Sequence, residues 1–279
     1  MLKRLIQKLE YQLDKLIVSG QYFRIFRKKI NWQKPKLLTE KLQVLKIDPA
    51  AEKLWTYVDK YEVRKFIKKT IGGRYLPKLY GVYQSPESIN LRLLPRQFVL
   101  KPTHGSGWEI ICKNKNQFDW PEAKKKLNHW LQINYYKKFR EKSYKLIKPR
   151  IICEQFLKDK KGEAYDYKFF CFHGRPKLIQ VDLDRFIDHT QNFYTPSWKK
   201  VPIARRFPVF KKKLTKPKKW KEMLGLAITL STGFPHVRVD LYNLDGRIYF
   251  GEMTFSSFAG FPVWKPGKYN QILGRYLKI

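Results

Sequence analysis

Two apolar runs near the end of the chain carry acidic side chains with the spacing of a cation-binding hairpin. Arg238 and Asp240 are two residues apart in the first run, and Glu252 and Thr254 are two apart in the second. Because alternate residues of a strand point to one face, pairing of the runs would bring the two carboxylates together. Two carboxylates and a hydroxyl suit Mg²⁺, which takes one or two carboxylates plus substrate phosphates. The alternative is a plain cross-strand salt bridge between Arg238 and Glu252.

A second stretch has the residue types of a phosphate-binding loop. The apolar run Phe98–Leu100 ends in Lys101, and Gly105-Ser106-Gly107 follows. Glycines let backbone N–H groups approach phosphate oxygens, and a lysine adds a point charge for the same oxygens. The stretch lacks the Gly-Lys-Ser/Thr ending of a P-loop. Taken alone, it is more typical of an ordinary hairpin turn.

Composition indicates a globular protein with anionic partners. The 279 residues leave room for two or three lobes, and hydrophobic residues make up 43% of the chain. The net charge of +36 favours nucleic acid, anionic lipid or an acidic polymer as a partner. Cys112, Cys153 and Cys171 lie in apolar runs, which predicts buried free thiols and a cytoplasmic protein. No stretch has the length of a membrane helix or the pattern of a signal peptide.

The elements that must position these residues can be placed by periodicity. We expect helices at 39–45, 51–70 and 220–231, and strands at 76–83, 98–100, 109–113, 151–157, 165–172, 177–181, 237–242 and 247–255. The charges in 59–64 have the spacing of intrahelical pairs. Residues 199–221 hold eleven Lys or Arg and no acid, which predicts an exposed basic loop.

The N-terminal segment predicts an amphipathic helix. Its apolar residues fall on one helical face, with basic residues on the other. Such a helix either packs on the body of the protein or lies on an anionic membrane. The apolar residues are Leu2, Leu5, Ile6, Leu9, Leu13, Leu16 and Ile17.

Taken in order, the motifs resemble the TupA-like ATP-grasp family of polysaccharide-biosynthesis clusters. The likeness covers most of the chain, and its segments are 59–64, 94–107, 166–174, 238–242 and 251–255. It implies an α+β ATP-grasp fold with two α+β lobes sandwiching ATP. Residues 1–93 would be a mainly helical N-terminal region, 94–157 a small lobe with the glycine-rich flap, and 158–279 a lobe holding an antiparallel sheet and the metal site.

The resemblance also implies a role for each candidate residue. Lys101 and Lys168 would hold ATP phosphates, and Arg238 would stabilise oxyanion charge during transfer. Thr254 stands where many superfamily members have Asn, which leaves the number of metals open. The remaining roles are flap N–H groups from Gly105, Ser106 and Gly107, adenine contacts from the backbone of Glu154, Gln155, Phe156 and Leu157, ribose contacts from Asp159 or Glu163, and Mg²⁺ ligands from Asp240, Glu252 and Thr254.

The implied activity is that of an ATP- and Mg²⁺-dependent carboxylate–amine ligase that acts through an acyl phosphate. Its substrates would be an acidic cell-surface polysaccharide or lipid-linked glycan precursor and an amine or amino acid. The protein would be cytoplasmic, in peripheral contact with the inner membrane face. Alternatives are a phosphoryl or glycosyl transferase of the same fold and pathway, and a nucleic-acid-binding protein. No RNA- or DNA-binding motif supports the last of these.

Overall fold

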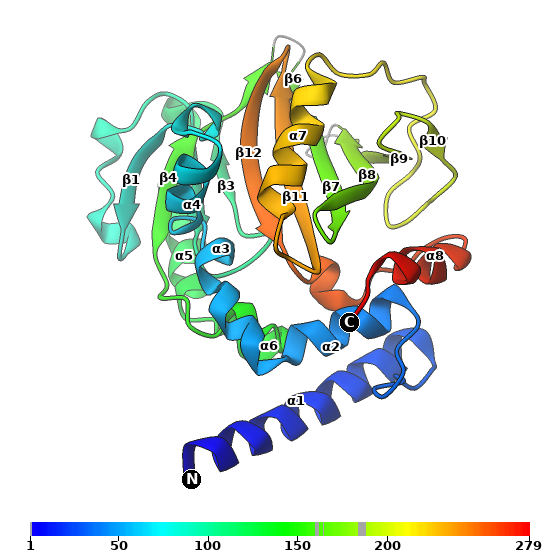
Figure 1. Ribbon diagram of the computed structural model, residues 1–279. Helices are drawn as coiled ribbons and strands as arrows, with labels where there is room; N and C mark the ends of the chain where they lie inside the picture. The colour runs from blue at the N-terminus through cyan, green and yellow to red at the C-terminus, as the bar shows by residue number, and fades with distance from the viewer. Residues whose placement is uncertain (1, 160–161, 164, 184–187) are drawn as a thin grey trace.

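The computed structural model describes residues 2–159, 162–163, 165–183 and 188–279, and it has a mixed α+β architecture built on two antiparallel sheets (Figure 1). A short third ribbon pairs β5 (Lys158–Asp159) with β6 (Gly162–Glu163). The α+β class predicted from the sequence is confirmed. The three cysteines are buried free thiols, as expected.

The smaller sheet carries the glycine-rich flap. Its strand order is β1-β4-β2-β3, and all its pairs are antiparallel. Phe98, Leu100 and Cys153 lie in one core with Leu127 of helix α5 (Trp120–Leu131). Residues 103–109 connect β2 to β3, so the predicted hairpin is confirmed. The strands are β1 (Leu79–Tyr83), β2 (Phe98–Pro102), β3 (Ile110–Cys112) and β4 (Ile151–Gln155).

The larger sheet has the strand order β10-β9-β8-β7-β11-β12 and is also antiparallel throughout. The predicted hairpins across 173–174 and 243–246 are both present. The strands are β7 (Asp166–Phe172), β8 (Arg175–Leu183), β9 (Thr190–Tyr194), β10 (Lys200–Val201), β11 (His236–Leu244) and β12 (Arg247–Thr254).

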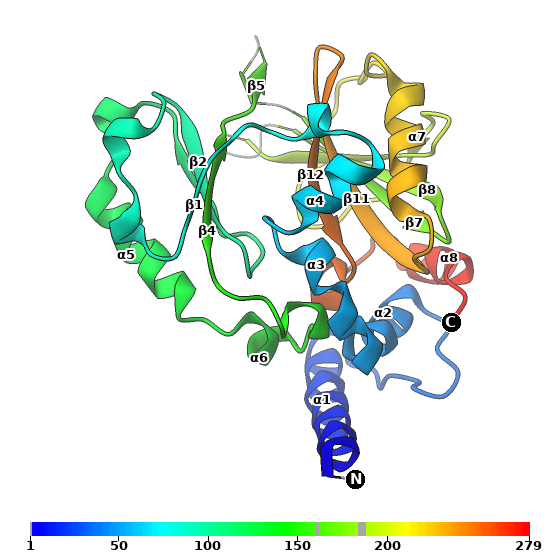
Figure 2. The ribbon, with the colours of Figure 1, turned by 60° about the vertical axis from the view of Figure 1, so that its left-hand side comes forward.

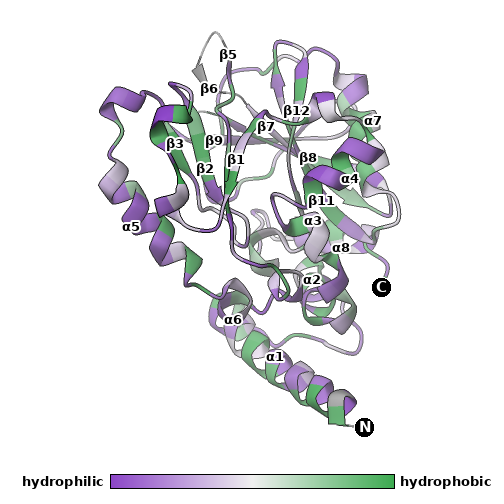
Figure 3. Ribbon diagram, turned by 90° about the vertical axis from the view of Figure 1, so that its left-hand side faces the viewer, coloured by the Kyte–Doolittle hydropathy of each residue, from purple (hydrophilic) through white to green (hydrophobic). Residues whose placement is uncertain are grey.

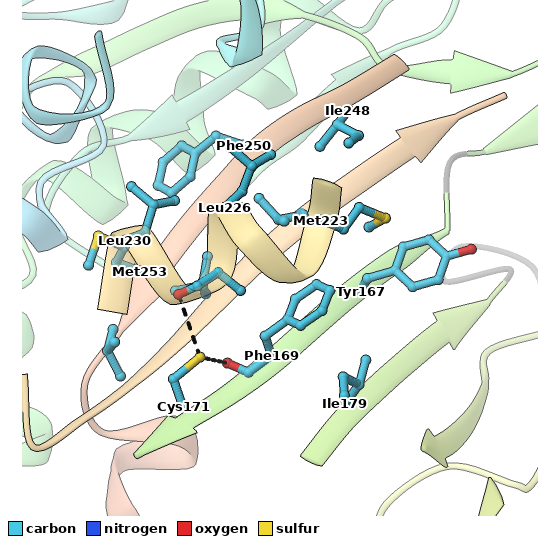
Figure 4. Close-up of a cluster of buried hydrophobic side chains, with 14 of the residues drawn as sticks. Tyr167, Phe169, Cys171, Ile179, Met223, Leu226, Leu230, Ile248, Phe250 and Met253 are labelled. Atoms are coloured by element: carbon cyan, nitrogen blue, oxygen red, sulfur yellow. Dashed lines mark hydrogen bonds between the residues drawn. The ribbon is translucent and has the colours of Figure 1, made fainter. Parts of the chain in front are cut away.

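Alternation gives the central strands β7, β8 and β11 two different faces. Their odd-numbered residues pack against helix α7 (Trp220–Ser231) in the main core, which includes Phe169, Ile179 and Met223 (Figure 4). Full burial of each such side chain contributes about 1.5–3 kcal/mol. The Cys171 thiol lies in this core and contacts the carbonyls of Phe169 and Ala227. This face anchors the sheet.

The even-numbered face is divided along its length. At one end Phe170, Phe172 and Leu178 pack with Leu42 of α2 (Leu38–Ile47) and Leu273 of α8 (Lys268–Tyr276). At the other end the residues are charged or polar, and they are buried: Asp166, Lys168, Gln180, Asp182, Arg238 and Asp240. The polar end forms the floor of the candidate site.

A β-bulge sets the face of the last strand. Asp240 pairs with Glu252, whereas Leu241 pairs with Phe250, so Gly251 is the extra residue on β12. The bulge turns Glu252 to the same face as Asp240, a use of bulges that is common next to active sites.

The helix expected at 51–70 is broken, which corrects that prediction. A 3₁₀ turn η1 (Pro49–Leu54) leads into α3 (Trp55–Val58), and α4 (Val63–Thr70) follows a turn (Figure 2). Asp59 causes the break, because its carboxylate accepts bonds from the N–H groups of Tyr61 and Glu62. The intrahelical pairing expected within 59–64 is also wrong: Asp59 pairs with Arg150, and Arg64 pairs with Glu154. Glu62 pairs with Lys65, which lies outside that segment.

Helix α1 (Leu2–Phe26) lies along the bottom of the body (Figures 1 and 3). It contacts the rest of the chain through Asp14, Val18 and Tyr22, and its predicted apolar face is left exposed. Among the described helices, none has the length and apolar character needed to cross a bilayer. The remaining elements are α6 (Tyr135–Phe139), η2 (Gly73–Tyr75), η3 (Pro86–Ser88), η4 (Leu91–Leu93), η5 (Lys115–Gln117), η6 (Lys142–Tyr144) and η7 (Ser257–Gly260).

Candidate active site

A cavity of about 410 Å³ is lined by residues of both main sheets and of the flap. The predicted residues that line it are Lys101, Ser106, Gly107, Glu154, Lys168, Arg238, Asp240, Glu252 and Thr254. These side chains are up to 153 positions apart in the sequence, from Lys101 to Thr254, and the two sheets bring them together.

Arg238 lies at the centre of the charged floor. Its Nε and Nη2 donate to the two oxygens of Asp240 at 2.7 and 2.8 Å, and Nη2 also donates to Glu252 Oε1 at 2.5 Å. Burial opposes the charge on Arg238, but the two carboxylates outweigh it and raise the pKa of Arg238 above its usual range. The cross-strand salt bridge between Arg238 and Glu252 is therefore present, and the two carboxylates of the predicted cation site both contact Arg238.

Lys168 neutralises the other side of the cluster. Its ammonium donates to Asp240 Oδ2 at 2.8 Å, contacts Asp166, and lies 3.8 Å from Asp182 Oδ2. Burial works to lower the pKa of Lys168, but the charges of Asp166 and Asp240 outweigh burial. The pKa of Lys168 is therefore raised above its usual value. The charge of Lys168 is thus held inside the cavity, where a phosphate could exchange for a carboxylate.

The donor set fits a hard divalent cation. The carboxylates of Asp240 and Glu252 face each other across paired strands, and the Thr254 hydroxyl donates to Glu252 at 2.9 Å. Burial works to raise the pKa of Glu252, but Arg238, Lys168 and Lys60 outweigh it and lower this pKa to about 2. Within the described ranges no cluster of three or more His, Cys, Asp or Glu has the form of a metal site. A two-carboxylate set suits Mg²⁺, which draws its other ligands from phosphates and water.

The small sheet supplies a further cation, Lys101, on the wall opposite this floor. Lys101 Nζ lies 3.1 Å from Glu154 Oε2, and Arg64 lies 2.5 Å from Glu154 Oε1. Lys60 donates to the carbonyl of Gly105 and so ties the flap to α4's N-terminal turn. The cavity therefore has lysines on both walls.

The family model described as TupA-like ATPgrasp matches residues 40–278. The chain belongs to the TupA-like ATP-grasp family. The ATP-grasp fold expected from the sequence is thereby confirmed. No curated protein matches the chain.

Solved structures similar to this ATP-grasp chain include several ligases. The ATP-grasp ligase PsnB complexed with a minimal precursor is 12% identical over 86% of this chain and 67% of its own, with a TM-score of 0.45. The D-alanine–D-alanine ligase from Bacillus anthracis complexed with ATP is 15% identical over 72% and 55%, with a TM-score of 0.42. The phosphoribosylamine–glycine ligase from Thermotoga maritima is 14% identical over 77% and 51%, also with a TM-score of 0.42. The chain spans about half to two thirds of their lengths.

The flap of this ATP-grasp chain depends on its glycines. Gly107 has a φ of +73°, and a side chain at Gly105 would collide with the ring of Trp108. His104, beside the flap, is buried, and its Nε2 lies 3.0 Å from the carbonyl of Trp130. This buried, hydrogen-bonded placement is typical of a structural histidine.

Other predicted contacts lie away from the cavity lining. Gln155, Phe156 and Leu157 continue from Glu154 beyond the lining residues, and the N–H of Gln155 donates to the carbonyl of Lys78. Asp159 and Glu163 belong to the β5–β6 ribbon, and their side chains lie outside the described part of the structure. Their proposed adenine and ribose contacts stay predictions.

Sequence reasoning missed several residues that line the cavity. Asp166 and Asp182 flank Lys168 on the floor, and each lies two residues from another polar residue in an otherwise apolar strand. That alternation was a usable signal for both. Glu141 and Tyr135 also line the cavity, and their irregular local sequence offered no signal.

Proposed function

We propose that the protein is an ATP- and Mg²⁺-dependent carboxylate–amine ligase that works through an acyl phosphate. The observation that carries this proposal is the convergence of Lys101, Lys168 and Arg238 with the Asp240–Glu252 pair in one cavity between two sheets. Membership of the ATP-grasp family supports ATP as the phosphoryl donor.

The side chains can perform this chemistry without a protein nucleophile. Lys101 and Lys168 bind phosphate oxygens, and the backbone N–H groups of Ser106 and Gly107 close over them. A substrate carboxylate oxygen attacks the γ-phosphorus and ADP leaves; an amine nitrogen then attacks the acyl carbon and phosphate leaves. Arg238 stabilises the oxyanion charge in both steps. Asp240, Glu252 and Thr254 would hold Mg²⁺, which would supply further charge neutralisation at the phosphates. Catalysis is mainly positioning and electrostatics.

Charge supports an acidic glycan as the carboxylate substrate. The net charge is +36, and Lys211, Lys212, Lys213 and Lys216 are exposed in the basic segment 199–221. Such a surface attracts a uronic-acid polymer or a lipid-linked acidic precursor, with an amine or amino acid as the second substrate. A phosphoryl or glycosyl transferase remains the alternative, since it would use the same ATP site.

The exposed face of α1 supports a position on an anionic membrane. Leu2, Leu5, Ile6, Leu9, Leu13 and Leu16 form one stripe and are 49–71% exposed. Exposed Arg4 and Lys8 lie along one flank of this stripe. An apolar stripe with adjacent cations fits the interface of a negatively charged bilayer. The protein would then work at the inner membrane face, where lipid-linked precursors are within reach.

Calorimetry of Mg²⁺·ATP binding tests the proposed function. Lys101→Ala and Glu252→Gln should each weaken binding at least tenfold, because each removes a charge on a different wall of the site. In Lys101→Ala the ion pair between Glu154 and Arg64 remains. In Glu252→Gln the ion pair between Arg238 and Asp240 remains, so both variants should fold. Lys125→Ala, on the exposed side of α5, is the control and should bind like wild type. Wild-type protein that binds no nucleotide in the presence of Mg²⁺ would refute the proposal.

A further inference from the structure

Glu141 places a carboxylate in the cavity that the chemistry above does not use. It immediately precedes η6, the side chain is only 4% exposed, and it lines the cavity. Burial of an ionisable group is costly unless a partner compensates. The burial of Glu141 therefore calls for a partner that compensates its charge.

No hydrogen bond or ion pair reaches the Glu141 carboxylate from the residues that the structure describes. The other acids described above are paired: Glu154 with Lys101 and Arg64, and Asp240 and Glu252 with Arg238. Among the described residues, Lys46 is the cation whose charge acts on Glu141, and its ammonium donates to the carbonyl of Ala259 at 2.9 Å. The missing partner is thus most simply a ligand in the cavity.

Two tyrosines share this part of the cavity with Glu141, whose charge acts on the pKa values of both. Tyr135 and Tyr144 line the cavity with ring centroids 4.5 Å apart, and Trp108 of the flap is 5.5 Å from Tyr135. Aromatic faces attract cations, and the attraction grows when water is excluded. A carboxylate among aromatic rings is the chemistry that recognises an ammonium group.

The part of the cavity that holds Glu141, Tyr135 and Tyr144 lies within electrostatic reach of Arg238 and Glu252. The charge of Glu252 acts on the pKa values of Glu141, Tyr135 and Tyr144, and the charge of Arg238 acts on that of Tyr144. An amine held at Glu141 would therefore lie beside an acyl phosphate formed at the Asp240–Glu252 pair.

We propose that Glu141, Tyr135 and Tyr144 form the binding site for the primary ammonium group of the amine substrate. The proposal rests on the ligase function above. Glu141 accepts one proton from the ammonium and so frees the nitrogen lone pair. The lone pair forms the C–N bond, and the C–O bond to phosphate breaks with its electron pair leaving on phosphate. The second proton that the nitrogen loses leaves with that phosphate.

Protonation supports this role. Burial, with a contribution from Glu252 and against the charge of Lys46, raises the pKa of Glu141 to about 8. Burial also lowers the pKa of Lys46 to about 7, while Tyr135 and Tyr144 stay neutral because their pKa values are raised. An ammonium ion binds the ionised carboxylate, so amine binding should strengthen as pH rises from 7 to 8.5.

Saturation-transfer NMR with ethanolamine as the probe tests the site directly. Wild-type protein should bind the probe, and Glu141→Gln should bind it at least about tenfold more weakly. Glu122→Gln, an exposed acid on α5, is the matched control and should bind like wild type. Equal binding by Glu141→Gln, or no binding by wild type, would overturn the proposal. Mg²⁺·ATP calorimetry on the same samples reports separately on the proposed function.

Thermal unfolding of the same variants separates function from structure. An unpaired buried carboxylate destabilises a fold, so Glu141→Gln should unfold at the wild-type temperature or higher. A midpoint lowered by more than about 4 °C would show instead that Glu141 stabilises the protein, which contradicts a ligand-binding role.

Discussion

Gly251 lies where a side chain would press on the neighbouring strand. A Cβ there would come within 3.1 Å of the Asp240 carbonyl and of the Tyr242 ring. Such contacts are tighter than ordinary packing, so a side chain at the bulge would push the neighbouring strand by a few tenths of an ångström. This effect can be tested against a glycine in open space.

We expect Gly251→Ala to shift Asp240 and so weaken Mg²⁺·ATP binding several-fold, with a loss of about 1–3 kcal/mol in the free energy of unfolding. Gly225→Ala is the matched change, because Gly225 is exposed within α7 and a Cβ there meets nothing within 4 Å. It should stabilise the protein by about 0.5–1 kcal/mol and leave nucleotide binding unchanged. Denaturant unfolding and calorimetry measure both effects. Equal behaviour of the two variants would contradict the role given to the bulge.

At the scale of elements, α1 makes the clearest prediction. The triple substitution of Leu5, Leu9 and Leu16 by Gln should abolish co-sedimentation with vesicles that contain 30% phosphatidylglycerol, because it removes the apolar stripe and keeps every charge. Wild-type protein should bind these vesicles and bind pure phosphatidylcholine vesicles much more weakly. The fold should tolerate the change, since these residues face solvent.

A matched variant controls for the loss of exposed apolar surface elsewhere. Leu93, Leu146 and Val263 are 81%, 50% and 47% exposed at other sites, and their replacement by Gln should leave vesicle binding intact. A different outcome would contradict membrane binding. If wild-type protein does not bind vesicles but forms a dimer, and the α1 variant does not, then a second copy of the chain covers this face.

The elements also show what could be read from the sequence. Regular strands and the helix at Trp220–Ser231 were predicted because their apolar periodicity is decided locally. The break at Asp59 was missed because it depends on a side chain that bonds to its own turn and to the distant Arg150. Likewise, Asp240 and Glu252 share a face only through the bulge at Gly251, which no spacing rule specifies. Glu141 escaped prediction because only the assembled cavity reveals that it lacks a partner.

The whole molecule is strongly cationic, and we expect this charge to act through a defined segment. Substitution of Lys211, Lys212, Lys213 and Lys216 by Gln should weaken binding to polygalacturonate at least about tenfold at 50 mM salt. The same number of charges removed at Lys28, Lys29, Lys68 and Lys69, also exposed, should have a much smaller effect. Both affinities should fall as salt rises, because exposed charges are screened. Fluorescence anisotropy of labelled polymer measures them, and equal losses would show that only total charge matters.

Arg238 has a consequence for how ligands reach the folded protein. Its guanidinium fills the space between Asp240 and Glu252, so the protein carries its own counter-ion at the place where a metal would bind. Free Mg²⁺ gains little by displacing an arginine, whereas Mg²⁺ together with a nucleotide also offers phosphate oxygens to the displaced side chain. Under the proposed function, metal and nucleotide binding would therefore be thermodynamically linked, and each would raise the affinity of the other by the same factor.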